Sequence, residues 1–267
     1  MKKVLYVCLV LVLFLPELQA LEQNTPQEDA KKNVFATRGD ITILEATENL
    51  RFLSQKIVKE YLFMFKAPYR EKVKNELKGL LVELSSNLDT IAATTKDKDT
   101  KDVLEFLAYS KDQIAHILTE PLDSEKAALM LDYSETLLEG ADSIAAAHMY
   151  RFTQEEKMLM VTKQMEYLLE RMMKYYMALH TGFDNTTNRE QMQEAIMAFN
   201  SRLQKIKAYR YTDELAPVKQ HVIQAWEVND GFFKKSEALF IPKLMILSTD
   251  YLESQILKIA LYHNQNQ

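Results

Sequence analysis

The chain has 267 residues, 47% of them apolar, and 33 basic against 38 acidic side chains give it a net charge of −5. It contains only five glycines, whereas average usage of about 7% would give about 19. This scarcity argues against β-sandwiches, barrels and Gly-rich phosphate loops, and it favours long helices with short connections. A net-acidic chain without a basic stripe is also a poor nucleic-acid binder, because that affinity depends on neutralising phosphates.

Residues 1–20 have the features of a secretory signal peptide. A basic pair precedes the apolar run 4–15, and residues 18–20 resemble a small-residue cleavage site. The run is shorter than the roughly 20 residues that a membrane-spanning helix needs. An uncleaved anchor is the alternative, because Leu18 is a poor residue at its place in the cleavage site. We therefore expect a periplasmic protein whose mature chain lacks cysteine, since Cys8 is the only one.

After a polar segment over 21–38, apolar residues recur every three or four positions, which predicts a chain of helices. Gly140 is the only breaker between 122 and 179, and one glycine costs only about 1 kcal/mol in a helix. We therefore expect that segment to be one helix, on the order of 85 Å long. Thr187 and Glu190 have the spacing of a capping box. The expected helices cover 40–66, 68–94, 100–118, 122–179, 187–209, 213–234 and 237–264, with Pro242 either kinking the last one or marking its true start.

The chain also contains an internal repeat. A gapless offset of 115 residues places Thr47–His148 over Thr162–His263 and keeps the apolar positions in phase. Each copy supplies four helical segments, enough to bury their apolar stripes in a four-helix bundle. We predict an elongated all-α protein with modules over 39–148 and 149–267 that share the long helix. The aligned apolar positions are Leu77, Leu81, Leu84, Leu88 and Ile91 in the first copy and Met192, Ile196, Phe199, Leu203 and Ile206 in the second.

The stretch Asn49–Leu62 carries a recognisable motif. It reads Asn-Leu-Arg-Phe-Leu-Ser-Gln-Lys-Ile-Val-Lys-Glu-Tyr-Leu. It resembles the first-helix signature of the type IV pili methyl-accepting chemotaxis transducer N-terminal domain, the family that includes the sensor region of NarX-type nitrate/nitrite kinases. The second copy keeps Arg171, Lys174 and Tyr176 but has Glu166 in place of the first arginine of the motif. The matching residues of the first copy are Arg51, Leu53, Ser54, Gln55, Lys59, Tyr61 and Leu62.

The resemblance implies an extracytoplasmic sensor. Members of this family are helical bundles that feed a membrane-spanning signalling module, and in nitrate-sensing relatives the motif arginine contacts a small anion at a subunit interface. It implies that Arg51 binds a nitrate-like oxyanion, with hydrogen bonds from Ser54 and Gln55 and peripheral attraction from Lys59. A homodimer is also expected. The chain has no kinase or methyl-accepting region, so a sensor of this kind would relay its signal to a separate membrane protein.

Helical periodicity alone makes Arg51 unusual. It falls inside the apolar arc of its helix, and a buried guanidinium needs a partner, which could be an internal carboxylate, a group of carbonyls or a bound anion. Phe52 and Phe63 fall on the opposite, polar side. They predict an interaction surface for another helix, from a dimer or a partner, although scattered exposed aromatics are common. A structural or adaptor module for protein–protein contact is therefore the alternative function.

Nothing in the sequence indicates catalysis, a cofactor or a metal. No two histidines are four residues apart and no His-Glu-x-x-His motif is present, so a zinc hydrolase is unsupported. The methionines of the long predicted helix could bind Cu(I). Methionine at helical spacing is far more often flexible core filler, and we interpret these residues in that way. We predict a protein that is not an enzyme.

Overall fold

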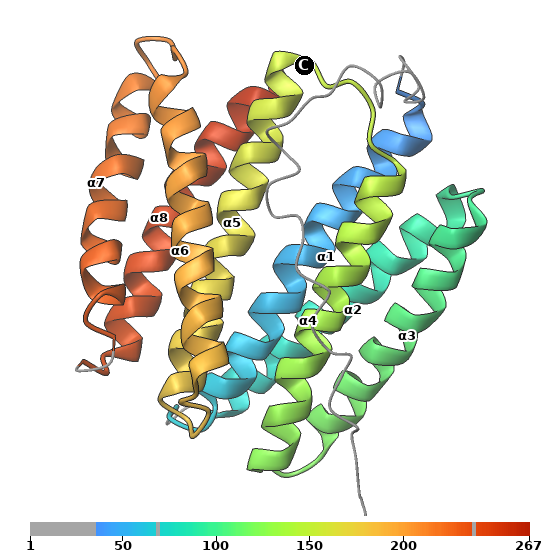
Figure 1. The fold of residues 1–267 in the computed structure, drawn as a ribbon, viewed down its shortest axis with the longest axis vertical. Coiled ribbons are helices and arrows are strands. Elements are labelled where there is room, and N and C mark those ends of the chain that lie inside the picture. Colours follow the sequence, from blue (N-terminus) through green and yellow to red (C-terminus); the bar gives the residue numbers. More distant parts are fainter. Residues whose placement is uncertain (1–35, 68–69, 237–238) are drawn as a thin grey trace, which may run out of the picture.

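The computed structural model describes residues 36–67, 70–236 and 239–267, and these form helices and no strand (Figure 1). The all-α prediction is confirmed. The expected signal peptide over 1–20, the polar segment as far as residue 35, and Pro68 lie outside the described residues. In chain order the helices are α1 (Arg38–Phe63), α2 (Arg70–Thr94), α3 (Lys98–Thr119), α4 (Ser124–Ala147), α5 (Gln154–Leu179), α6 (Thr186–Ala208), α7 (Ala216–Phe233) and α8 (Pro242–Gln265).

The prediction of one long helix over 122–179 is wrong. Helix α4 ends at Ala147 and α5 begins at Gln154. Thr153 caps α5 because its side chain accepts a hydrogen bond from the backbone N–H of Glu156, whose carboxylate accepts one from the N–H of Thr153 at 2.6 Å. This reciprocal pair starts a helix without any glycine or proline nearby. The sequence therefore does contain a signal for this helix start, the Thr-x-x-Glu spacing of Thr153 and Glu156. A search for glycine and proline alone overlooks it.

The start of α6 differs from the predicted one, and the start of α8 decides between the two roles expected for Pro242. Asn185 caps α6 by accepting a hydrogen bond from the N–H of Asn188 at 2.8 Å, so the capping box predicted at Thr187 and Glu190 is wrong. Pro242 is the first residue of α8. A proline there costs no intrahelical hydrogen bond, because the first N–H groups of a helix have no partner within it. Pro242 therefore marks the start of the last helix and does not kink it.

Helices α1 and α5 are the centres of the packing. Helix α1 packs against α2, α4 and α5, while α5 packs against α6 and α8 as well as α1. Helix α3 contacts α2 and α4, and α7 contacts α6 and α8. The first four and the last four helices thus lie side by side through α1 and α5 (Figure 1). The expected elongated shape, which depended on a shared helix joining two bundles end to end, is therefore also wrong.

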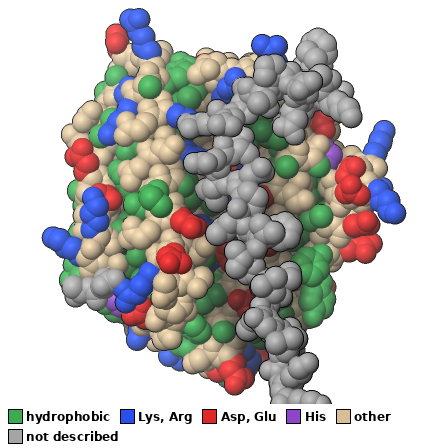
Figure 2. All heavy atoms as spheres, in the orientation of Figure 1, with side chains coloured by type: hydrophobic (Ala, Val, Ile, Leu, Met, Phe, Trp, Pro, Cys, Tyr) green, Lys and Arg blue, Asp and Glu red, His purple; other side chains and the backbone are tan. Residues whose placement is uncertain are grey.

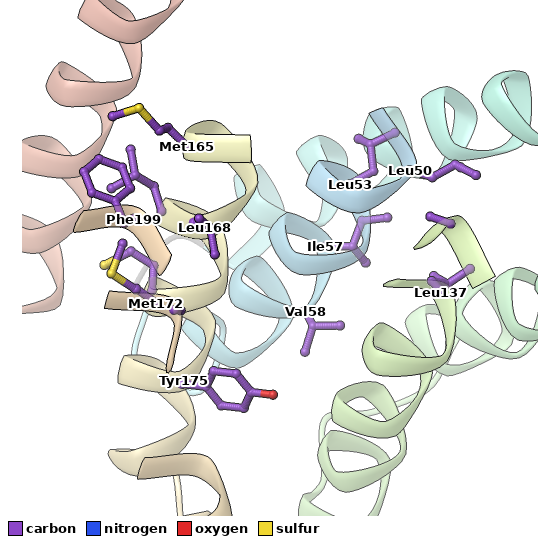
Figure 3. Packing of buried hydrophobic residues seen from close by; sticks show 14 of the residues in the cluster. Leu50, Leu53, Ile57, Val58, Leu137, Met165, Leu168, Met172, Tyr175 and Phe199 are labelled. Carbon is purple, nitrogen blue, oxygen red and sulfur yellow. The ribbon is translucent and has the colours of Figure 1, made fainter. Parts of the chain in front are cut away.

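Both central helices are apolar on more than one face, which explains their place. Leu50 and Ile57 of α1 are completely buried and lie toward Leu137 of α4, whereas Met172 of α5 lies beside Phe199 of α6 (Figure 3). Burying one such side chain contributes about 1.5–3 kcal/mol of hydrophobic stabilisation relative to leaving it exposed. A helix with apolar residues around most of its circumference is stable only in the interior of a protein.

A histidine–carboxylate contact recurs in both sets of helices. His148, at the end of α4, lies with Nδ1 3.0 Å from Oδ1 of Asp40 in the first turn of α1. His263, in the last turn of α8, lies with Nδ1 2.5 Å from Oε2 of Glu155 in the first turn of α5. Both members of the second pair follow their counterparts by 115 residues (155 − 40 and 263 − 148). The same contact therefore ties the first helix of each set to its last helix.

Candidate functional site

The four motif residues expected to bind a ligand lie on α1, but the structure does not bring them into one site. Ser54, Gln55 and Lys59 are buried, and Arg51 is nearly so. Arg51, at the middle of α1, reaches toward α4, Ser54 and Gln55 lie near Ser134 of α4, and Lys59 contacts α5. Of these four residues, only Lys59 contacts the second set of helices, whereas Arg51, Ser54 and Gln55 make these contacts within the first set.

Arg51 is held by two carboxylates of its own chain. Its Nε donates to Oδ1 of Asp142 on α4 at 2.6 Å, and its Nη1 forms an ion pair with Glu48 one turn earlier on α1. Burial raises the pKa of Glu48 to about 7, against the opposing effect of the nearby Arg51 charge. Of the three partners that the sequence left open for this guanidinium, internal carboxylates are the ones that it contacts. An anion at Arg51 would have to compete with both of them.

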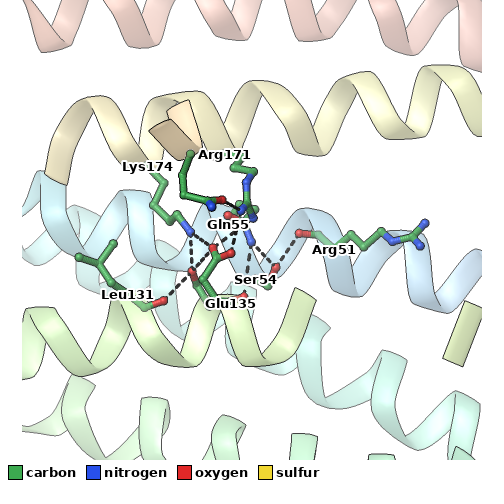
Figure 4. Close-up of polar contacts among 9 residues, drawn as sticks. Arg51, Ser54, Gln55, Leu131, Glu135, Arg171 and Lys174 are labelled. Carbon is green, nitrogen blue, oxygen red and sulfur yellow. Dashed lines mark hydrogen bonds and ion pairs between the residues drawn. The ribbon is translucent and has the colours of Figure 1, made fainter. Parts of the chain in front are cut away.

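Ser54 and Gln55 lie beside a second, unpredicted cluster (Figure 4). Gln55 Nε2 donates to Ser54 Oγ at 2.9 Å, while Lys174 Nζ of α5 donates to Ser134 Oγ at 2.7 Å. Lys174 also pairs with Glu135 of α4. Burial lowers the pKa of Lys174 to about 8. In Figure 4 the side chain of Arg51 extends away from this cluster, so the motif residues divide between separate networks.

Glu135 is the centre of that cluster. Nη2 of Arg171 on α5 lies 2.8 Å from Oε2 of Glu135, which therefore pairs with two cations of α5. Although burial opposes ionisation, Lys174 and Arg171 together lower the pKa of Glu135 to about 2. Two cations sharing one carboxylate connect α5 firmly to α4. Glu135 could not be singled out from the sequence, because nothing there distinguishes it from the solvated acidic residues around it.

Lys59 makes the corresponding contact from α1 to α5. Its Nζ lies 2.8 Å from Oε2 of Glu170 and 3.2 Å from Oε1 of Glu60, and both Lys59 and Glu170 are buried. Burial opposes the charge of Lys59, but Glu170 and Glu60 raise its pKa above the ordinary value. Lys59 and Lys174 are 115 residues apart and were aligned by the repeat. That alignment was the available signal that both lysines lie at equivalent, buried positions.

A cavity of about 370 Å³ opens beside this junction. Four glutamates and one lysine contribute its charged side chains, so its lining is strongly acidic. Oε2 of Glu48 and Oε1 of Glu166 are buried without a hydrogen-bond partner. Burial also raises the pKa of Glu166, and it raises that of Glu253 to about 7. The cavity is lined by Glu48, Asn49, Phe52, Leu53, Glu83, Ser86, Asn87, Lys163, Glu166 and Glu253.

A second cavity, of about 570 Å³, adjoins the first through the shared residue Glu253. We call the two together the α2–α8 groove, because both of those helices line it, although α1 contributes more of the lining residues than either. Phe52 lines the first cavity and Phe63 the second, and Lys56 Nζ lies 4.7 Å from the centre of the Phe52 ring. Four lysines and four carboxylates line the second cavity and balance in charge. The two aromatics expected to form an interaction surface therefore lie along one groove.

Other kinds of site lack support in the part of the chain that the structure describes. No group of three or more His, Cys, Asp or Glu side chains there could hold a metal ion. No helix within residues 36–67, 70–236 and 239–267 combines the length and the hydropathy of a membrane span. Basic and acidic side chains are interspersed on the face shown in Figure 2. Comparison of the chain with protein-family models, curated proteins and solved structures finds no match.

Proposed function

We propose that the chain is an exported, non-enzymatic, sensor-like protein made of two copies of a four-helix module. The recurring contacts of His148 with Asp40 and of His263 with Glu155 support the duplication. In the family that the motif resembles, the arginine lies at an interface between subunits. In this chain the α1–α5 junction would take the place of that interface, and a separate membrane protein would receive the signal.

The ligand that the cavity favours is a small organic cation, such as a diamine. The observation that carries this proposal is the excess of glutamate in the cavity of about 370 Å³, together with buried carboxylate oxygens of Glu48 and Glu166 that have no hydrogen-bond partner. A cavity of this volume suits a small molecule. Glu48 and Glu166 already pair through their other oxygens with Arg51 and Lys163, and ammonium groups would supply the donors that the remaining oxygens lack. A charged donor strengthens each such hydrogen bond. The oxyanion implied by the resemblance would meet carboxylates here, and Arg51 is already paired.

Binding in this cavity would act on both modules at once. Glu48 belongs to α1, whereas Glu166 and Glu253 belong to α5 and α8. A cation that contacts all three would stabilise one relative placement of the two sets of helices over others. A ligand shifts such an equilibrium only by its difference in affinity for the two placements. Contact with both modules provides that difference, which is what a sensor requires.

Calorimetric titration with 1,4-diaminobutane and with nitrate tests the proposal. We expect heat with the diamine, an affinity about tenfold weaker in Glu253→Gln, and no change in the control Glu214→Gln, which replaces an exposed glutamate outside the groove. No heat with the diamine would contradict the proposed ligand class. Heat with nitrate that disappears in Arg51→Ala, but persists in the exposed-arginine control Arg210→Ala, would support the oxyanion instead.

A second candidate is the adaptor function, in which a helix of a partner protein occupies the α2–α8 groove. The observation that favours it is the position of Phe52 and Phe63 along one groove, since aromatic side chains commonly anchor a docked helix. In that case Phe52→Glu and Phe63→Glu would abolish assembly with the partner, as measured by light scattering. Diamines and nitrate would have no effect on that assembly.

A further inference from the structure

Helix α8 has an exposed apolar stripe along most of its length. Five large apolar side chains on it are each between 45% and 68% exposed, and they follow one another at intervals of three, four, six and four residues. The opposite face of α8 packs into the core through Met245, Leu252 and Ile256. A helix that is apolar on both faces is normally covered on both. The stripe consists of Leu244, Leu247, Tyr251, Leu257 and Leu261.

The equivalent helix of the first module carries no such stripe. Subtracting 115 from the five positions leads to residues 129, 132, 136, 142 and 146 of α4, which are Leu, Asp, Thr, Asp and Ala. Only Leu129 among them is a large apolar residue. Packing within a module therefore does not require apolar residues at these positions. The stripe is a property of α8 alone, so its explanation lies outside the packing that α4 and α8 share.

The exposed face of α8 is complementary to itself when reversed. An antiparallel copy centred on Ser254 brings together residues whose numbers add to 508. This register places Leu247 opposite Leu261 of the other copy and Tyr251 opposite Leu257, while Leu244, at the end of the stripe, falls opposite Asn264. The exposed Asp250 falls opposite the exposed Lys258, and the small, exposed Ser254 meets itself at the centre.

We propose that a second copy of this chain covers the stripe, with the two α8 helices packed antiparallel about a two-fold axis at Ser254. A two-fold contact uses the same patch on both subunits, so the patch must match itself, as this one does in apolar character and in charge. With Ser254 counted between Tyr251 and Leu257, the seam positions follow one another at three and four residues, a spacing that keeps a seam facing its partner along paired helices. The charge match of Asp250 with Lys258 favours a second copy over an unrelated helix, which would not share this symmetry.

The mass of the full-length chain in solution tests the proposal. Light scattering at roughly 100 µM should give twice the 31.1 kDa of one chain. Leu247→Glu combined with Leu261→Glu should give a monomer with an unchanged circular dichroism spectrum. The control Met197→Glu, which changes an equally exposed side chain on α6, should remain a dimer. A wild-type monomer at this concentration would overturn the proposal, and so would a dimer in the double variant.

Charge reversal tests the register. Asp250→Lys and Lys258→Asp should each weaken dimerisation by about tenfold, because like charges then face each other across the interface. The two changes combined should restore it. Asp250 also faces the buried Lys59, so thermal unfolding of Asp250→Lys is measured in parallel. Failure of the combined variant to restore a dimer, while it stays folded, would overturn the register.

A cross-link tests the axis without altering any charge. In a Cys8→Ser background, Ser254→Cys should form a disulfide-linked dimer on mild oxidation. The control Ser143→Cys, exposed on α4, should not do so. Equal cross-linking of the two variants, or none at position 254, would contradict an axis at Ser254. Asp250, Ser254 and Leu257 also line the second cavity of the α2–α8 groove, whereas the diamine is proposed for the first. Dimerisation is therefore measured without diamine, and diamine binding is measured separately in the Leu247→Glu, Leu261→Glu variant, so this proposal and the proposed function can fail separately.

Discussion

Removing the carboxylate of Glu135 should destabilise the chain far more than removing the lysine that it pairs with. Glu135→Gln leaves Lys174, whose side chain is 0% exposed, and Arg171, which is 12% exposed, without their shared carboxylate. Breaking a buried ion pair by removing one partner costs about 3–5 kcal/mol. The Glu135 side chain is 31% exposed, so solvent screens part of the interaction, and we expect about 3 kcal/mol, at the lower end.

Lys174→Met should cost less than about 1 kcal/mol, because it removes a buried charge and keeps most of the apolar stem. Glu135 would still pair with Arg171 at 2.8 Å. The double variant Glu135→Gln with Lys174→Met should then lose less than the sum of the single changes, by about 2 kcal/mol. Urea unfolding at pH 7, followed by circular dichroism, measures all three free energies of unfolding.

The control for this cycle is Glu139→Gln, which replaces an exposed glutamate of the same helix and should change the free energy of unfolding by less than about 0.5 kcal/mol. Additivity of Glu135→Gln and Lys174→Met within about 0.5 kcal/mol would refute the reasoning. So would a cost of Lys174→Met equal to that of Glu135→Gln. Either result would mean that Glu135 does not hold the buried lysine in its charged form.

Three further predictions concern pH, helix packing and the repeated histidines. Burial raises the pKa of Glu48 from 4.5 to about 7, so as the pH rises the unfolded chain loses the Glu48 proton at a lower pH than the folded chain does. The free energy of unfolding should therefore fall between pH 4.5 and 7, by on the order of 1–3 kcal/mol. Urea unfolding at pH 5 and 7.5 should show this fall, and Glu48→Gln should reduce it; an equal fall in the variant would contradict the assignment. Gly140→Ala should destabilise by about 1–3 kcal/mol, because the added methyl would overlap a side chain of α3, whereas Gly79→Ala meets open space and should stabilise by up to about 1 kcal/mol. Thermal unfolding compares the two, and equal shifts of the same sign would contradict the close approach of α3 and α4. His263→Ala and His148→Ala should each lower the free energy of unfolding by about 1–3 kcal/mol. The loss should be larger for His263, because its side chain is 0% exposed and that of His148 is 11% exposed. The reverse order in urea unfolding would contradict this.

Local features of the fold could be predicted from the sequence to the extent that they depend on nearby residues. The apolar period located the helices, but the break before α5 depends on a polar pair, Thr153 and Glu156, rather than on glycine or proline. The spacing of apolar residues does not determine which buried face of a helix packs against which other helix. Packing of α1 on α5 therefore could not be predicted, because both helices are apolar on several faces.

For the candidate site too, features that depend on nearby residues could be predicted, whereas contacts between distant residues could not. A buried Arg51 with a partner followed from its place in the apolar arc, but its contact with Asp142 joins residues 91 positions apart. Lys59 and Glu170 are 111 positions apart. A single sequence contains many carboxylates, and only the tertiary packing selects among them. The acidic lining of the first cavity combines residues of α1, α2, α5 and α8, and it could not be predicted from the sequence for the same reason.

A crystal structure of the chain grown with both 1,4-diaminobutane and nitrate would test the proposed binding site most directly. We predict electron density for the diamine in the α2–α8 groove, with its nitrogen atoms within hydrogen-bond distance of Glu166 and Glu253, and with Arg51 still bound to Asp142. Density for nitrate on the Arg51 guanidinium, with Glu48 and Asp142 displaced and the groove free of amine, would contradict it.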